Sequence, residues 1–196
     1  MLSGCDGSGK TTLVRVLAAY FSGRGSVGWF WLRGSHLFAS LLLRFFSRVG
    51  VFRGACNPYY GVCLPEALRG VWALVEFWSV LPYLLLRRLL SAFFKFFVCD
   101  RGVLDFVVWV VATLDYPRFI SSLCGRFLLR LASREGAVYL YADRDVLVKR
   151  ADVPASFVAR ECAVYGVLAK YFARCRVNTG AVGPAGAAAR VLKCVG

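Results

Sequence analysis

The sequence predicts an α/β fold in three layers, with a mostly parallel five-stranded sheet flanked by helices. Two patterns support this prediction. Short apolar runs alternate with stretches of helical periodicity, and a glycine-rich loop joins the first apolar run to a helix. The chain has 196 residues, enough for one sizeable core. We therefore expect a single domain that covers residues 1–196.

The expected strands are five short runs rich in β-branched or aromatic residues, a composition that suits buried strands. They are Met1–Ser3, Val27–Leu32, Phe94–Cys99, Ala137–Tyr141 and Arg176–Asn178.

Three helices are expected between or beside these strands. The first covers Lys10–Phe21 and ends before the glycines at 23 and 25. The second is long, covers Pro65–Leu90 and is interrupted at Pro82. The third begins just after Pro154, where apolar residues and Glu161 recur at helical spacing.

The segment Gly4–Thr11 matches the phosphate-binding pattern G-x-x-x-x-G-K-[ST]. A short apolar strand precedes it and an amphipathic helix follows, so its backbone amides would face phosphate groups. Lys10 would reach the terminal phosphates of ATP, and the Thr11 hydroxyl would ligate Mg²⁺. The residues expected to bind ATP are Gly4, Asp6, Gly7, Ser8, Gly9, Lys10, Thr11 and Thr12.

A carboxylate ends the apolar run that begins at Phe94. Asp100 would lie at the carboxyl edge of a buried strand, where a second group on the Mg²⁺ side is needed. Thr11 and Asp100 are therefore the expected metal residues. Arg101 follows directly, and the alternative is that Asp100 and Arg101 form a surface ion pair.

Three segments together resemble the thymidylate kinase family over nearly the whole chain. They are the loop Cys5–Thr12 with its internal acid, the triplet Asp100-Arg101-Gly102, and Arg33 after the second expected strand. The resemblance implies a P-loop NTPase fold with a short lid at about residues 150–160. It also implies transfer of a phosphoryl group from ATP to a nucleoside monophosphate, with dTMP as the first acceptor to expect.

The resemblance also assigns roles to single residues. Asp6 would contact the 3′-hydroxyl of the acceptor sugar, while Arg33 and Arg101 would hold the acceptor phosphate through bidentate hydrogen bonds. Arg150 and Arg160 would close over ATP, although each one taken alone could equally be a solvated charge on a helix. Catalytic roles are implied for Lys10, Asp100, Arg101, Arg150 and Arg160.

The chain departs from the family at two places that concern base recognition. Gly102 replaces a tyrosine or phenylalanine, and no arginine occurs in Glu76–Ser79, where one normally contacts the base. Phe77 and Trp78 are the candidates to stack on the base, with burial in the core as the alternative. A related kinase for another small acceptor therefore remains an alternative.

The formal net charge of +14 would attract polyanions, so a nucleic-acid-associated ATPase is a second alternative. The arginines are dispersed rather than gathered in basic runs, which favours a phosphorylated small substrate. The apolar stretch 71–86 is shorter than a bilayer span and contains Glu76 and Pro82, so we expect a buried helix or a homodimer interface. We expect a cytoplasmic protein without stable membrane association.

None of the eight cysteines forms a C-x-x-C pair, and most are expected to be small buried residues. Cys56 and Cys63 bracket a loop with tyrosines and a proline. Their pairing as a disulfide is left open.

Overall fold

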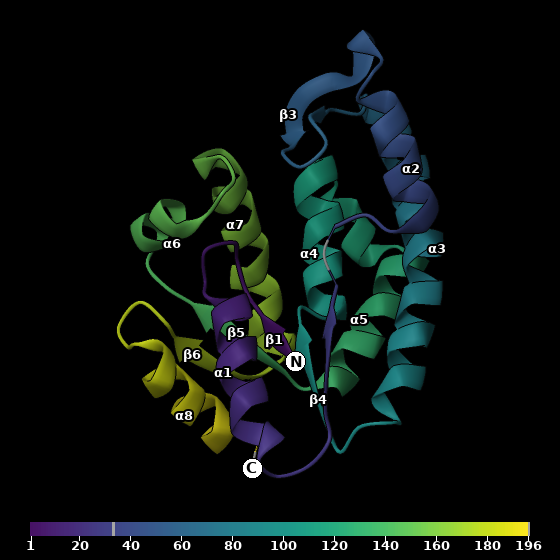
Figure 1. Cartoon of the computed structure of the whole chain (residues 1–196). Helices are drawn as coiled ribbons and strands as arrows, with labels where there is room; N and C mark the ends of the chain where they lie inside the picture. Colours follow the sequence, from purple (N-terminus) through teal and green to yellow (C-terminus); the bar gives the residue numbers. More distant parts are fainter. Residues whose placement is uncertain (33, 196) are drawn as a thin grey trace.

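The computed structural model describes residues 1–32 and 34–195 and confirms the α/β layer prediction (Figure 1). All five strands of the sheet run parallel, in the order β2-β4-β1-β5-β6. The strands are β1 (Leu2–Ser3), β2 (Val27–Trp31), β4 (Phe96–Asp100), β5 (Ala137–Tyr141) and β6 (Ala173–Asn178). The short β1 lies in the centre, so the loop that follows it opens at the carboxyl edge of the sheet.

Helices cover both faces of the sheet (Figure 1). One face packs against α1 (Lys10–Ser22) and α8 (Pro184–Val195). The other face carries α3 (Glu66–Ser91), α4 (Val103–Leu114), α5 (Leu123–Glu135) and α7 (Ala155–Phe172). The remaining helical segments are α2 (Leu37–Phe46), η1 (Gly50–Phe52), η2 (Pro117–Ser121) and α6 (Arg144–Arg150).

Helix α4 forms the centre of the larger core. All of its residues are buried, and it packs against both α5 and α7. Asp105 is its single charged residue. A helix that is apolar on all sides has to be enclosed by other elements, which explains why three helices surround α4 on this face of the sheet.

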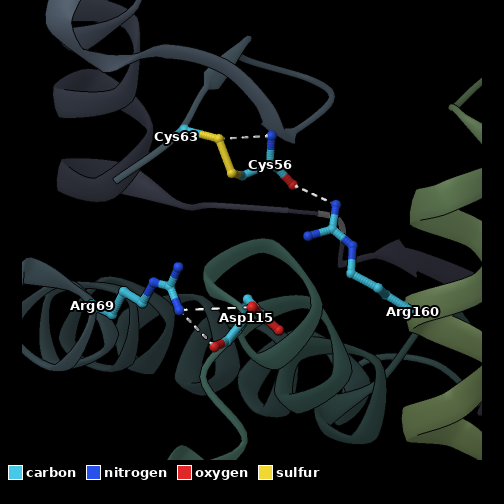
Figure 2. The surroundings of a disulfide bond; sticks show 5 residues. All are labelled: Cys56, Cys63, Arg69, Asp115 and Arg160. Carbon is cyan, nitrogen blue, oxygen red and sulfur yellow. Dashed lines mark hydrogen bonds and ion pairs between the residues drawn. A yellow bond between two sulfur atoms is a disulfide. The ribbon is translucent and has the colours of Figure 1, made fainter. Parts of the chain in front are cut away.

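Strand β3 (Arg53–Asn57) lies outside the sheet, in a hairpin whose return segment includes Val62 (Figure 1). A disulfide between Cys56 and Cys63 closes this hairpin (Figure 2), and it is the pairing that the sequence alone left undecided. A second disulfide, which the sequence did not suggest, joins Cys175 of β6 to Cys194 of α8. Disulfides are rare in a reducing cytosol outside hyperthermophiles, so these two bonds bear directly on the expected cytoplasmic location.

The expected interruption of the long helix at Pro82 is wrong, because α3 continues from Glu66 to Ser91 through the proline. Proline removes one backbone hydrogen bond but does not forbid a helix when packing holds both halves. Val80 and Leu84, on either side of Pro82, are both buried in the core. No helix in the described residues is long and apolar enough to cross a membrane.

Candidate active site

The glycine-rich loop connects β1 to α1 and adopts a conformation that its glycines permit. Gly4 and Gly7 have φ angles of 156° and 80°. A Cβ on Gly4 would lie 2.3 Å from the Leu140 carbonyl oxygen, and a Cβ on Gly7 would lie 2.4 Å from the Leu147 carbonyl oxygen. Only glycine allows this close approach of the backbone, and the loop therefore curves tightly enough to cradle an anion.

Lys10 is the first residue of α1 and is only 4% exposed. Its Nζ donates to the Gly4 carbonyl at 2.7 Å and to the Cys5 carbonyl at 2.8 Å. Burial lowers the pKa of Lys10, and the nearby Arg101 charge lowers it further, while Asp6 opposes both. The ammonium group is thus held against the inside of the phosphate-binding loop.

The two expected metal residues are in direct contact. The Thr11 hydroxyl donates to Asp100 Oδ2 at 2.6 Å, because the end of β4 lies beside the start of α1. The second oxygen of Asp100 is buried and has no hydrogen-bond partner among the described residues. A hydroxyl and a carboxylate with a spare oxygen are hard ligands that fit Mg²⁺.

Asp6 and Arg101 form an ion pair at the tip of the loop. Arg101 has a φ of 75°, a backbone conformation that is rare outside glycine and is typical of functional sites. Burial opposes ionisation of Asp6, but the charges of Arg101 and Lys10 and a hydrogen bond from Tyr59 lower its pKa to about 2. Burial likewise opposes ionisation of Arg101, and the charges of Asp6 and Asp105 raise its pKa.

Helix α7 closes the loop from the side through two consecutive residues. The Asp6 amide donates to Glu161 Oε2 at 2.9 Å. The Cys162 Sγ lies 2.8 Å from the Cys5 Sγ. Burial, together with the charge of Asp6, raises the pKa of Glu161 to about 7. The sequence analysis used Glu161 only as a marker of helical periodicity and missed this contact.

Asp105 of α4 is a second residue that the sequence analysis missed. Its carboxylate accepts hydrogen bonds from the Ser3 hydroxyl, the Gly4 amide at 3.2 Å, the Gly102 amide at 2.9 Å and the Tyr165 hydroxyl at 2.6 Å. It therefore ties β1 and the loop to α4 and α7. A lone acid inside an apolar helix was the available signal, because charged residues are almost never fully buried without partners.

A cavity of about 230 Å³ lies on the α8 side of the loop. Arg150, at the end of α6, lines it and donates to the Thr179 carbonyl at 3.4 Å. Its other lining residues include Gly9, Thr12 and Pro184. Arg160 of α7 instead donates to the Cys56 carbonyl in β3 at 3.3 Å (Figure 2). The two expected lid arginines therefore contact different parts of the molecule.

A larger cavity of about 470 Å³ lies beneath the β3 hairpin, and four of its lining residues are aromatic. They are Trp31, Tyr59, Tyr60 and Trp109. Trp109 is 5% exposed, and its Nε1 has no hydrogen-bond partner among the described residues. Arg44 also lines this cavity and an adjoining one of about 380 Å³. An unpaired buried donor in a cavity wall marks a place where a polar ligand atom can bind.

The two aromatic candidates for base stacking do not line these cavities. Phe77 packs edge-on against Phe127 of α5 in the core. Trp78 is 67% exposed on the outer face of α3. Arg33 lies outside the described residues. Gly102 has a local reason to be glycine, because a Cβ there would lie 2.5 Å from the Glu135 carboxylate.

The parallel sheet, the glycine loop and the Thr11–Asp100 contact together define a P-loop NTPase fold. No protein-family model and no curated protein sequence matches the chain. Among solved structures, the thymidylate kinase from Candida albicans is similar in fold, with a TM-score of 0.58 and 13% sequence identity. The match covers 99% of this chain and 88% of that one. The chain thus shares the fold of this kinase.

Proposed function

We propose that this protein is an ATP- and Mg²⁺-dependent kinase that phosphorylates a nucleoside monophosphate, with dTMP as the first acceptor to test. The observation that carries the proposal is the Asp6–Arg101 ion pair, which a hydrogen bond from Tyr59 connects to the aromatic cavity that Tyr59 lines. An arginine at this position suits the phosphate group of an acceptor whose base occupies that cavity.

The mechanism that we propose relies on positioning and charge neutralisation, since the acceptor phosphate is already an anionic nucleophile. Lys10 and the loop amides would bind the β- and γ-phosphates of ATP, and Arg101, with Arg33, would hold the acceptor phosphate in line. Thr11 and Asp100 would hold Mg²⁺, which neutralises charge on the phosphates when bound. No residue has to act as a strong general base.

We further propose that residues 150–160 act as a lid in a single domain that covers residues 1–196. Arg150 borders the smaller cavity, where the adenine of ATP would bind beside Thr12. Closure of this segment would exclude water and limit ATP hydrolysis. Arg160 would act from the opposite side, through its hydrogen bond to the hairpin.

The identity of the acceptor is the open part of the proposal. The similar Candida albicans enzyme is described as having broad substrate specificity. In this chain Trp109, whose buried Nε1 has no partner among the described residues, lines the aromatic cavity, whereas residues 76–79 of α3 contain no arginine. A kinase for a different small acceptor is therefore the second candidate function.

We propose a homodimer that forms through the exposed apolar faces of α2 and α3. On α3 these side chains recur at steps of three, four or seven residues, which places them on one face of the helix. It comprises Val71, Leu74, Trp78, Leu85 and Leu89, which are 49–67% exposed. Phe38, Leu41 and Phe45 of α2 are also more than 60% exposed. Sedimentation analysis, in which Trp78→Glu should yield monomers, tests this interface.

The function is tested by measuring ADP release with dTMP, other monophosphates, nucleosides or no acceptor. Turnover that depends on dTMP supports the proposal, and preference for another acceptor keeps the kinase but changes its substrate. Turnover without an acceptor that rises with added nucleic acid would instead support the nucleic-acid-associated ATPase suggested by the charge of +14. We also propose that the protein is located in the cytoplasm, and imaging of the tagged protein tests this.

A further inference from the structure

The β3 hairpin brings a tyrosine to the phosphate-binding loop. The disulfide between Cys56 and Cys63 closes the hairpin, and the Gly54 amide donates to the Gly61 carbonyl at 3.0 Å. Arg160 of α7 holds the hairpin from outside through the Cys56 carbonyl (Figure 2). The turn between the two cysteines, which contains Tyr59, is therefore restrained on both sides.

Tyr59 is fixed by its ring as well as by its hydroxyl group. The ring lies 5.3 Å from the ring of Trp109 on α4 and 6.3 Å from that of Phe157 on α7, measured between centroids. Phe157 is fully buried, and Trp109 is 5% exposed. These two rings form a wall that directs the Tyr59 hydroxyl toward the loop.

Both oxygens of the Asp6 carboxylate are engaged by side chains of this chain. The Tyr59 hydroxyl donates to Oδ2, and the Arg101 guanidinium donates to Oδ1. The Asp6 side chain is only 6% exposed, so little of the carboxylate is left for another donor. A sugar hydroxyl that approached Asp6 would have to displace the phenol.

We propose that Tyr59 determines the sugar specificity of the acceptor site, by filling the place at Asp6 that the 3′-hydroxyl of the acceptor would take. This inference rests on the proposed kinase function and deepens it. The site then accepts nucleoside monophosphates with and without a 3′-hydroxyl about equally well. It also differs from the role that the family resemblance implied for Asp6.

The test is calorimetric titration of the protein with dTMP and with 2′,3′-dideoxythymidine monophosphate. For the wild type we expect dissociation constants within about threefold of each other, because no net hydrogen bond to the 3′-hydroxyl is gained. In Tyr59→Phe the second Asp6 oxygen becomes available. This variant should bind dTMP about five- to tenfold more tightly than the dideoxy analogue.

The matched control is Tyr171→Phe, which removes a hydroxyl from a 77%-exposed tyrosine on α7 and should keep the wild-type ratio. A wild type that already prefers dTMP by tenfold would overturn the inference, as would an unchanged ratio in Tyr59→Phe. Near-ultraviolet circular dichroism checks that the variants are folded. Failure of the wild type to bind either monophosphate, while it binds ATP, would overturn the proposed kinase function itself.

Discussion

The phosphate-binding side and the acceptor side of the site are built in different ways. The phosphate-binding side is one continuous segment, Gly4–Thr11, whose expected metal residue Thr11 is joined by the distant Asp100. The acceptor side is assembled from β3, α4 and α7, whose residues are far apart in the chain. Backbone shape dominates the first region and side-chain packing the second. Substitutions should therefore damage chemistry on the first side and selectivity or stability on the second.

Lys10→Ala tests the phosphate-binding side and should have the largest effect. Removal of a charged donor that acts on the transferred phosphate should lower kcat by at least about a hundredfold. Binding of the acceptor in the absence of ATP should stay unchanged, because Lys10 does not line the aromatic cavity. Steady-state kinetics with Lys170→Ala as an exposed control measure the difference. Equal loss of acceptor binding would show that the two sides are not separable.

Asp105→Asn tests the connection between the two sides. The amide group of asparagine would face hydrogen-bond donors that Asp105 now satisfies, including the Gly102 amide. We expect the free energy of unfolding to fall by roughly 3 kcal/mol. Urea denaturation measures the loss, with Asp115→Asn as the control, since the Asp115 side chain is 67% exposed. Similar stability of the two variants would contradict the role given to Asp105.

Glu76→Gln tests a smaller effect, the cost to stability of a buried carboxyl group on α3. Glu76 accepts hydrogen bonds from Ser35 and Trp72, but burial raises its pKa from 4.5 to about 7. A folded-state pKa above the unfolded value means that the wild type loses stability as the pH rises from about 4.5 to 7. The variant should match the wild type near pH 4.5 and exceed it by up to about 3 kcal/mol above pH 7.

Urea denaturation across this pH range measures that difference. Glu66→Gln, at the exposed start of the same helix, is the control and should follow the wild type at every pH. Parallel stability curves for Glu76→Gln and the wild type would show that Glu76 is ionised in the folded protein.

The two disulfides allow a finer comparison. Replacing either cysteine pair with serine should lower the free energy of unfolding by roughly 2–3 kcal/mol. Each bond restricts the unfolded chain, and the loops that they close are short, which limits the loss. Only loss of the Cys56–Cys63 bond should change the relative affinity for dTMP and its dideoxy analogue, by about threefold, since that hairpin positions Tyr59. Loss of the Cys175–Cys194 bond should leave this ratio unchanged. Calorimetric titration of both double variants decides between these outcomes.

The fold and the phosphate-binding side could be predicted to a large extent. Four of the five strands were placed within two residues at each end, and the loop motif predicted the position of Lys10 and Thr11. The last strand begins three residues earlier than expected, at Ala173, and the helix through Pro82 is uninterrupted. These differences arise where tertiary packing overrides local preference.

The acceptor side could not be predicted in the same way. The hydrogen bond from Tyr59 to Asp6 joins residues 53 positions apart, and that from Tyr165 to Asp105 joins residues 60 apart. No local pattern encodes such a pair. Aromatic character alone does not place Phe77 and Trp78, because the packing of α3 buries Phe77, leaves Trp78 exposed to solvent and puts neither ring in the wall of the aromatic cavity.

The sequence by itself determined the features that depend on neighbouring residues. These are the alternation of strands and helices, the glycine loop and the carboxylate at the end of β4, because backbone preferences and spacing act locally. Tertiary structure alone decided that Tyr59 meets Asp6, that Asp105 joins the loop to α4 and α7, and that Arg160 contacts the hairpin. Those contacts depend on how whole elements pack, which buries charges and pairs them across long stretches of chain.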